Sequence, residues 1–163
     1  MLKIVFKICC GIDVHKDFVV ACIAKTDDKN VTTYQTKRFS TFTNGLRELS
    51  EWLYSNSYKD VCMESTGKYW YPVFNILEDS CKVIVAHPKY VKAIRGKKTD
   101  KKDAKWIADL FKHDLVVSSF IPDRCIRQLR DLCRYYCKHC TNISFHSFLL
   151  IHYIFHIKNS FIK

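Results

Sequence analysis

Four carboxylates in three short motifs are the residues whose types and spacing best suit chemistry in this chain. Asp13 and Glu64 each follow an apolar run that predicts a buried strand, whereas Asp100 and Asp103 lie one helical turn apart beside several lysines. Hard divalent cations such as Mg²⁺ prefer oxygen ligands, and two such ions about 4 Å apart can activate a water or hydroxyl and stabilise a leaving oxygen. The four residues are therefore candidate metal ligands and catalytic residues, with Mg²⁺ or Mn²⁺ as cofactor.

Each of these carboxylates also has a structural interpretation. Asp13 could cap a turn, Asp100 is a good helix N-cap residue, and Asp103 suits the first turn of a helix. Glu64 is harder to explain in this way, because a lone buried glutamate is costly without a partner. Spacing alone favours the metal site only slightly.

The chain also carries a large excess of positive charge. Its formal net charge is +11 and its pI is about 9.2, which is typical of proteins that bind nucleic acid. Eight Lys or Arg and only two Asp lie between residues 89 and 105, although a solvated face is the alternative explanation. Such side chains contact phosphates and give affinity without sequence choice. The predicted nucleic-acid-binding residues are Lys16, Lys89, Lys92, Arg95, Lys97, Lys98, Lys101, Lys102 and Lys105.

The order of the predicted elements indicates an α/β domain in which helices flank a mixed sheet. Apolar or alternating segments rich in β-branched residues predict strands at 3–12, 18–24, 32–40, 60–64 and 82–86. Helical periodicity and capping residues predict helices after Thr43 or Asn44, over 71–77, from Pro88 to about Arg95, from Asp100, and after a cap at Asp123. Three antiparallel strands followed by alternating helices and strands make up this fold class.

The cysteines and the C-terminal residues bear on location and organisation. Nine cysteines, an odd number, and no evident signal peptide favour free thiols in a reducing cytoplasm. Residues 141–157 contain no Asp, Glu, Lys or Arg, but their three histidines argue against a membrane span. We predict a domain over 1–122, the start of a helical linker over 123–140, and a tail over 141–163 that a truncation or frameshift would leave. An aggregation-prone or partner-covered tail is the alternative.

A zinc site is the weaker interpretation of a cluster of Cys and His near the end of the chain. Cys133, Cys137 and Cys140 with His139 or His146 have part of the required spacing, but no second clean pair follows. Cys133 and Cys137 also fit one buried face of a helix.

Two other motifs remain open to more than one interpretation. The aromatic residues 69–71 could stack on unpaired bases, but Trp70 is at least as well suited to sealing the core. Residues 11–13 also resemble the start of an actin-like ATPase fold. His15 and Lys16 occupy the places where that fold needs small residues around phosphate, which disfavours it.

Three motifs carry a resemblance to a known family: Gly-Ile-Asp-Val-His-Lys at 11–16, Glu-Ser-Thr-Gly-Lys-Tyr-Trp at 64–70, and Lys-Thr-Asp-Lys-Lys-Asp-Ala at 98–104. In order and separation they resemble the N-terminal domain of the DEDD transposases of bacterial insertion sequences, the family numbered one-hundred-and-ten and related to site-specific invertases. The similarity extends from about residue 8 to residue 139. Three linked motifs in register are far more specific than any one alone.

The resemblance implies an RNase H-like (RuvC-like) fold in which Asp13, Glu64, Asp100 and Asp103 bind the metal ions. It also implies a DNA transposase or recombinase whose partners are DNA and a structured guide RNA, and whose full-length form is a homo-oligomer. No membrane association is implied.

The family's C-terminal domain supplies a nucleophilic serine that has no match here. Ser144, Ser147 and Ser160 carry no recognisable motif. We therefore expect an N-terminal fragment that keeps the metal site but lacks the serine domain. The alternative is a catalytically inactive remnant that binds structured RNA or DNA.

Overall fold

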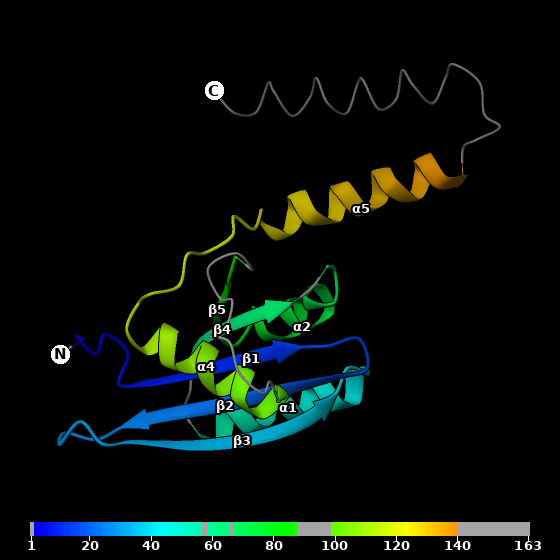
Figure 1. Cartoon of the computed structure of the whole chain (residues 1–163). Coiled ribbons are helices and arrows are strands. Elements are labelled where there is room, and N and C mark those ends of the chain that lie inside the picture. Colours follow the sequence, from blue (N-terminus) through cyan, green and yellow to red (C-terminus); the bar gives the residue numbers. More distant parts are fainter. Residues whose placement is uncertain (1, 57–58, 66, 88–98, 140–163) are drawn as a thin grey trace. The chain divides into compact units, whose positions relative to one another are not determined.

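Five strands form one mixed sheet in the N-terminal part of the chain (Figure 1). They are β1 (Ile8–Val14), β2 (Phe18–Thr26), β3 (Thr32–Ser40), β4 (Asp60–Ser65) and β5 (Lys82–Val85), in the order β3-β2-β1-β4-β5. The β1–β2 and β2–β3 pairs are antiparallel, whereas β1–β4 and β4–β5 are parallel. The predicted mixed sheet is confirmed.

The structure is a computed structural model that describes residues 2–56, 59–65, 67–87 and 99–139. The chain divides into two compact units, Met1–Ser119 and Phe120–Lys163. The first unit contains the sheet with helices α1 (Thr43–Ser55), α2 (Trp70–Leu77) and α4 (Asp100–Lys112), and the second contains α5 (Arg124–His139). The helix predicted from Pro88 to Arg95 lies outside the described residues.

The predicted strand at 3–12 is present as β1, but its predicted start was wrong, because β1 begins at Ile8. The backbone N–H groups of Val5 and Phe6 donate to the carbonyl oxygen of Lys112, at 2.9 and 3.1 Å, and not to a neighbouring strand. An apolar segment can thus look like a strand in sequence while it pairs with the end of a helix. The other four predicted strands agree with the structure to within two residues at either end.

Two predicted helix caps had different outcomes. Asp123 is confirmed, since its Oδ1 accepts a hydrogen bond from the Ile126 N–H at 3.0 Å. The prediction that Thr43 or Asn44 caps α1 was wrong, because Phe42 is the N-cap residue and gives no side-chain hydrogen bond. The Phe42 carbonyl nevertheless accepts the Leu46 N–H at 3.0 Å, so the helix begins one residue earlier than its polar residues suggest.

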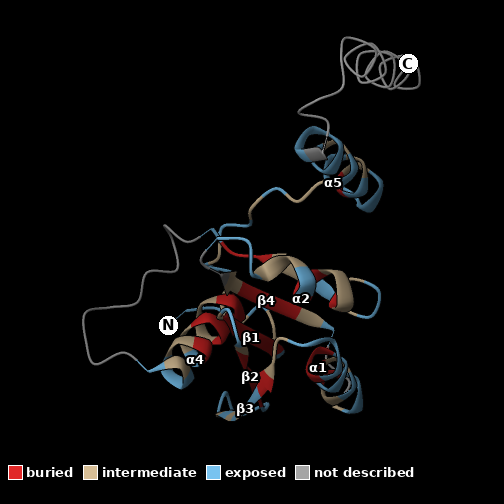
Figure 2. Cartoon of the chain, turned by 90° about the vertical axis from the view of Figure 1, so that its right-hand side faces the viewer, coloured by how far each residue is buried: buried red, intermediate tan, exposed pale blue. Residues whose placement is uncertain are grey.

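Helices cover both faces of the sheet in the first unit (Figure 2). Helix α4 lies on one face, against β1 and β2, while α1 and α2 lie on the other. Side chains alternate between the two faces of a strand, so Cys9, Gly11 and Asp13 of β1 face α4. The intervening Cys10 and Ile12 face the opposite layer, and all five residues are buried. A central strand buried on both faces explains the continuous apolar run that precedes Asp13.

Gly11 allows α4 to lie directly on the central strand. A Cβ atom at this position would be 2.3 Å from the backbone nitrogen of Ala108 and 2.5 Å from the carbonyl oxygen of Ala104. No side chain fits in that space, so the backbones of helix and strand are in direct contact. The start of α4 is therefore held close to the end of β1.

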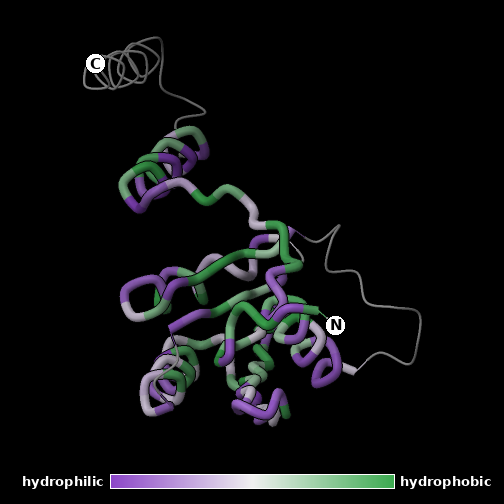
Figure 3. Tube along the Cα trace, turned by 90° about the vertical axis from the view of Figure 1, so that its left-hand side faces the viewer, coloured by the Kyte–Doolittle hydropathy of each residue, from purple (hydrophilic) through white to green (hydrophobic). Residues whose placement is uncertain are grey.

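Helix α5 is amphipathic: hydrophobic and hydrophilic residues alternate along its turns (Figure 3). Cys133 is half-buried on this helix and Cys137 is exposed. None of the helices in the described parts of the chain has the length and apolar character that crossing a membrane requires.

Candidate metal centre

Asp13 and Glu64 lie side by side on neighbouring strands. They are register partners in the parallel β1–β4 pair, and each is the second-last residue of its strand. Gly11 and Cys62, two residues earlier on each strand, face α4; Cys62 belongs to the same buried cluster as Ala108 of that helix. The alternation of side chains therefore puts both carboxylates on the face of the sheet that α4 covers.

The first turn of α4 brings Asp100 to the same place. Ala104 lies over Gly11, and Asp100 precedes Ala104 by four residues, on the same side of the helix. The Nε2 atom of His15 lies 2.9 Å from Asp13 Oδ2 and 3.6 Å from Asp100 Oδ1. One potential ligand atom from each of these three side chains lies within 4.8 Å of the others. Residues 87 positions apart in the chain thus share one cluster (100 − 13 = 87).

The electrostatics of Asp13 favour a cation at this point. Burial is the main cause of a raised pKa at its carboxyl group, and the negative charges of Asp103 and Asp100 act in the same direction. The charge and hydrogen bond of His15 oppose this rise. A bound cation would offset both the burial and the repulsion, because it favours the ionised carboxylate. The effect on Asp13 also shows that Asp103 lies within electrostatic range.

The donor atoms present fit a divalent cation. Asp13 and Asp100 supply carboxylate oxygens, which suit Mg²⁺ and Mn²⁺. Glu64 is half-buried next to Asp13, and Asp103 is half-buried in the first turn of α4. Within the described residues, Asp13, His15 and Asp100 are the group of three His, Cys, Asp or Glu side chains close enough to hold an ion. The ligand roles of Glu64 and Asp103 stay predictions.

His15 was not among the site residues predicted from the sequence. It is half-buried and its ring lies 4.6 Å from that of Phe18. Its position two residues after Asp13 was the available signal, since side chains two apart in an extended segment point to the same side. On the sequence, His15 belongs to the motif at 11–16 and disfavours phosphate-loop chemistry, but neither point predicted a ligand role.

Four of the predicted nucleic-acid-binding residues can be placed. Lys16 is exposed in the turn between β1 and β2, and Lys101, Lys102 and Lys105 are exposed on the first turns of α4. They are close in sequence to Asp13, Asp100 or Asp103, and the Nζ atom of Lys105 lies 4.1 Å from the centroid of the Tyr34 ring. The other five, Lys89, Lys92, Arg95, Lys97 and Lys98, lie outside the described residues.

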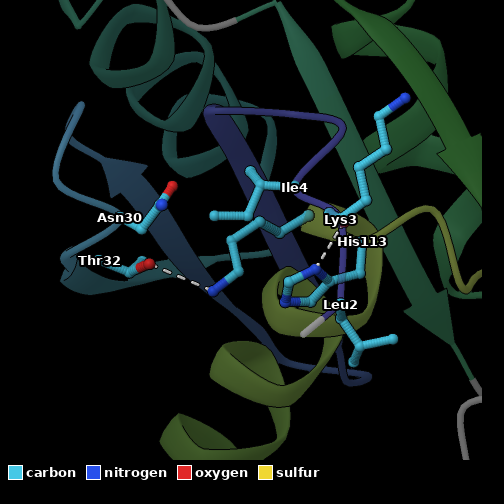
Figure 4. A pocket seen from close by; sticks show the side chains of 7 residues that line it. Leu2, Lys3, Ile4, Asn30, Thr32 and His113 are labelled. Carbon is cyan, nitrogen blue, oxygen red and sulfur yellow. Dashed lines mark hydrogen bonds between the residues drawn. The ribbon is translucent and has the colours of Figure 1, made fainter.

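Two hollows open at opposite ends of α4. The smaller, of about 240 Å³, lies beside Asp100. The larger, of about 430 Å³, lies beside the last turn of the helix, where His113 Nδ1 is 2.9 Å from the carbonyl oxygen of Lys3 (Figure 4). Its residues are Leu2, Lys3, Ile4, Asn30, Thr32, Lys112 and His113, with no carboxylate among them. The candidate metal ligand Asp100 therefore borders the smaller of these two hollows.

Lys112, one of the two lysines that line the larger hollow, is part of a structural network. The Lys112 Nζ donates to Asp109 Oδ1 at 3.1 Å and to Thr32 Oγ1 at 3.2 Å. The Tyr34 hydroxyl also donates to Asp109. Burial alone would lower the Lys112 pKa, but the hydrogen bond and charge of Asp109 outweigh it and raise the pKa. Lys112 therefore ties α4 to β3.

The structure bears on the aromatic motif at 69–71 and on part of the cluster of Cys and His near the end of the chain. Trp70 is half-buried and makes ring contacts with Tyr71 and Phe74, at centroid distances of 5.1 and 5.7 Å. This packing agrees with a structural role, whereas base stacking stays a prediction. Cys140 and His146, two of the residues in the zinc hypothesis, lie outside the described residues.

The mixed sheet in the order β3-β2-β1-β4-β5, with helices on both faces, is that of an RNase H-like (RuvC-like) fold, as predicted. The family model described as a transposase, that of the DEDD transposases of the IS110 insertion sequences, matches residues 10–146. This match covers more than half of the chain. The chain belongs to this family of transposases.

Several solved structures resemble the chain. RuvC from Thermus thermophilus has 13% identity and a TM-score of 0.49, covering 69% of this chain and 99% of that one. The T. thermophilus RuvC complex with a Holliday junction substrate has 11% identity, a TM-score of 0.47 and the same coverage. The fowlpox virus resolvase with substrate Holliday junction DNA has 21% identity and a TM-score of 0.40, covering 64% of this chain and 72% of that one. No curated protein sequence matches the chain.

Proposed function

We propose that this domain acts on DNA phosphodiesters during transposition, with Asp13, Glu64, Asp100 and Asp103 as ligands for Mg²⁺ or Mn²⁺. The observation that carries the proposal is the meeting of Asp13 with Glu64 in strand register and with Asp100 across the Gly11 contact. Membership of a transposase family supports it. An alternative role for the acids as caps explains neither the burial of Asp13 nor its closeness to Asp100.

The four carboxylates differ in how firmly the fold holds them. Asp13 belongs to the central strand, which pairs with β2 on one side and β4 on the other. Asp100 and Asp103 belong to the first turn of α4, where the helix dipole stabilises negative charge. His15 donates to Asp13, because a carboxylate can only accept, and this bond fixes the orientation of the carboxylate.

A bound pair of divalent ions would polarise the scissile phosphate and help to generate a nucleophile at neutral pH. The task of the chain is to place its ligands and to hold the substrate beside them. Lys16, Lys101, Lys102 and Lys105 are exposed, lie close in sequence to the carboxylates and suit the phosphates of the backbone.

The family resemblance extends the proposal to partners and location. We propose DNA and a structured guide RNA as the nucleic acids, and a homo-oligomer as the active form of the full-length protein. We place this activity in the bacterial cytoplasm, where the nine cysteines would stay reduced.

Two measurements test the proposal. Isothermal titration of Mn²⁺ should show binding to the chain, and Asp13→Ala or Glu64→Ala should weaken it at least about tenfold, as loss of a ligand or its close support does. Nicking of supercoiled plasmid with Mg²⁺ or Mn²⁺ should be abolished in the same variants. Glu48→Ala is the matched control, since Glu48 is exposed on α1, on the other face of the sheet.

The result also separates the two functional classes. Metal-dependent nicking that is lost with Asp13 or Glu64 supports the catalytic assignment. Salt-sensitive binding of nucleic acid without any turnover would instead support a silent binding module. Nicking that survives both substitutions would remove the catalytic assignment altogether.

A further inference from the structure

The smaller hollow lies between the edge strand β3 and the start of α4. Its volume is about 240 Å³, and the atoms that line it are mostly apolar, although they belong to residues that include two cations and one candidate metal ligand: Val20, Thr36, Arg38, Thr99, Asp100 and Lys101. Arg38 and Thr36 belong to β3, whereas Lys101 is in the first turn of α4. No nucleic-acid contact was predicted from the sequence for the three strand residues in this lining, Val20, Thr36 and Arg38.

Arg38 lies in one row with the candidate metal ligands. Arg38 is the register partner of Val20, Val20 is that of Asp13, and Asp13 is that of Glu64. Register partners on neighbouring strands point to the same face of a sheet. Because strands are about 4.8 Å apart, the backbone of Arg38 is about 10 Å from that of Asp13. The row thus passes from carboxylates to a cation across four strands.

The guanidinium of Arg38 is held in place by an aromatic ring. Its Cζ lies 3.6 Å from the centroid of the Phe18 ring, and that ring is 4.6 Å from the ring of His15. Stacking of this kind fixes the plane of the guanidinium while its N–H groups at the edge remain able to donate. A planar fork of donors matches the oxygens of a phosphate group.

We infer that the surface beside this hollow binds the phosphodiester backbone of a nucleic-acid strand next to the candidate metal centre, with the guanidinium of Arg38 as a contact to one phosphate. This inference rests on the proposed function. Lys101, which also borders the hollow, adds a second positive charge. Asp100 at the border opposes a phosphate until a cation neutralises it, so phosphate binding beside the hollow is coupled to metal binding.

The neighbouring Lys37 provides a matched control for Arg38. Both residues carry one positive charge on the same strand and both are exposed. Successive side chains of a strand point to opposite faces, and the Lys37 Nζ lies 4.9 Å from the centroid of the Phe39 ring on the α1 side. Substitution of either residue removes the same net charge, but only Arg38 faces the hollow.

The test is fluorescence anisotropy with oligothymidylate and oligouridylate of equal length, over a range of KCl, in Mg²⁺ and in EDTA. Arg38→Ala should lower affinity about tenfold and reduce the salt slope by about 0.7, the value for one phosphate contact on a single strand. Lys37→Ala should change affinity less than about twofold. Arg38→Lys should keep most of the salt slope, and the two oligonucleotides show whether DNA or RNA is preferred.

Equal effects of Arg38→Ala and Lys37→Ala would overturn the inference, since they would show bulk charge and no local contact. Thermal melting checks the fold of each variant, and Arg38→Lys tests the contact if Arg38→Ala unfolds. Loss of the salt slope with Arg38→Lys as well would likewise contradict a charge contact. Arg38-dependent binding without any nicking would leave the hollow in place and refute the proposed catalysis, so the two failures are distinguishable.

Discussion

Replacement of Asp13 by Asn should stabilise the metal-free domain and abolish its stabilisation by metal. Asp13 is only 6% exposed, and burial raises its pKa, with Asp103 and Asp100 adding to the effect. The ionised carboxylate is therefore unfavourable in the folded state unless a cation is present. Asparagine keeps the shape and the acceptor oxygen for His15 but carries no charge.

The size of the effect follows from the distance between the charges. Ligand oxygens of Asp13 and Asp100 lie within 4.8 Å. Two unit charges at that separation repel by about 3 kcal/mol at an effective dielectric constant of about 20, and by about 1 kcal/mol in water. The Asp100 side chain is 49% exposed, so solvent screening places the repulsion near the lower value. Relief of about 1–2 kcal/mol would raise the Tm by about 3–6 °C for a chain of this size.

The pH dependence has a definite sign. The folded-state pKa of Asp13 is raised above the ordinary value of 3.8. The folded state therefore binds more protons between these two values, and metal-free stability falls as pH rises through this range. Above the raised pKa the penalty is complete and constant. Asp13→Asn should remove this fall.

Thermal melting in EDTA and in Mg²⁺ or Mn²⁺, at several pH values, is the assay. A cation at ten times its Kd should stabilise the unsubstituted chain by about 1.4 kcal/mol and the Asn variant not at all. Glu48→Gln, which removes an exposed charge from α1, should change neither quantity. A lower Tm for Asp13→Asn in EDTA, or metal stabilisation that survives the substitution, would refute the reasoning.

Three further outcomes are expected. Gly11→Ala should leave little folded protein, since its Cβ would meet the backbone of α4 at 2.3 Å, and soluble yield with circular dichroism checks this. Lys112→Met should lower the free energy of unfolding by about 2–3 kcal/mol in urea titration, because Asp109 loses its partly buried partner. Iodoacetamide should label exposed Cys125 well before Cys9, whose pKa burial raises to about 12, as peptide mass spectrometry would show. The packing described would be contradicted by equal labelling rates of the two cysteines, by an unchanged free energy of unfolding in Lys112→Met, or by a stably folded Gly11→Ala variant.

The sheet was predictable because its signals are local. β-branched residues and alternation predict strands at 18–24 and 32–40, and both segments are strands in the structure. The start of β1 was not predictable, because Val5 and Phe6 bond to the end of a helix more than a hundred residues later in the sequence. Pattern in a short window carries no information about such a partner.

The same distinction between local and long-range signals applies to the candidate site. The carboxylates could be named from residue type and spacing, and the chain's order of strands and helices brings Asp13 together with Asp100. Arg38 could not be found in this way, since on sequence it is one cation among many on a half-exposed strand. Its place in a row with Asp13 depends on the registers of two strand pairs, which only the folded chain defines.

The missing side chain at Gly11 makes the spacing of the ligands depend on a residue that can perform no chemistry. Any substitution there would push the helix away from the strand. Asp100 and Asp103, which belong to this helix, would then move away from Asp13 and Glu64. Loss of metal affinity can therefore originate at a position that no inspection of donor atoms would single out. Variation at this glycine would silence such a domain as effectively as deletion of a ligand.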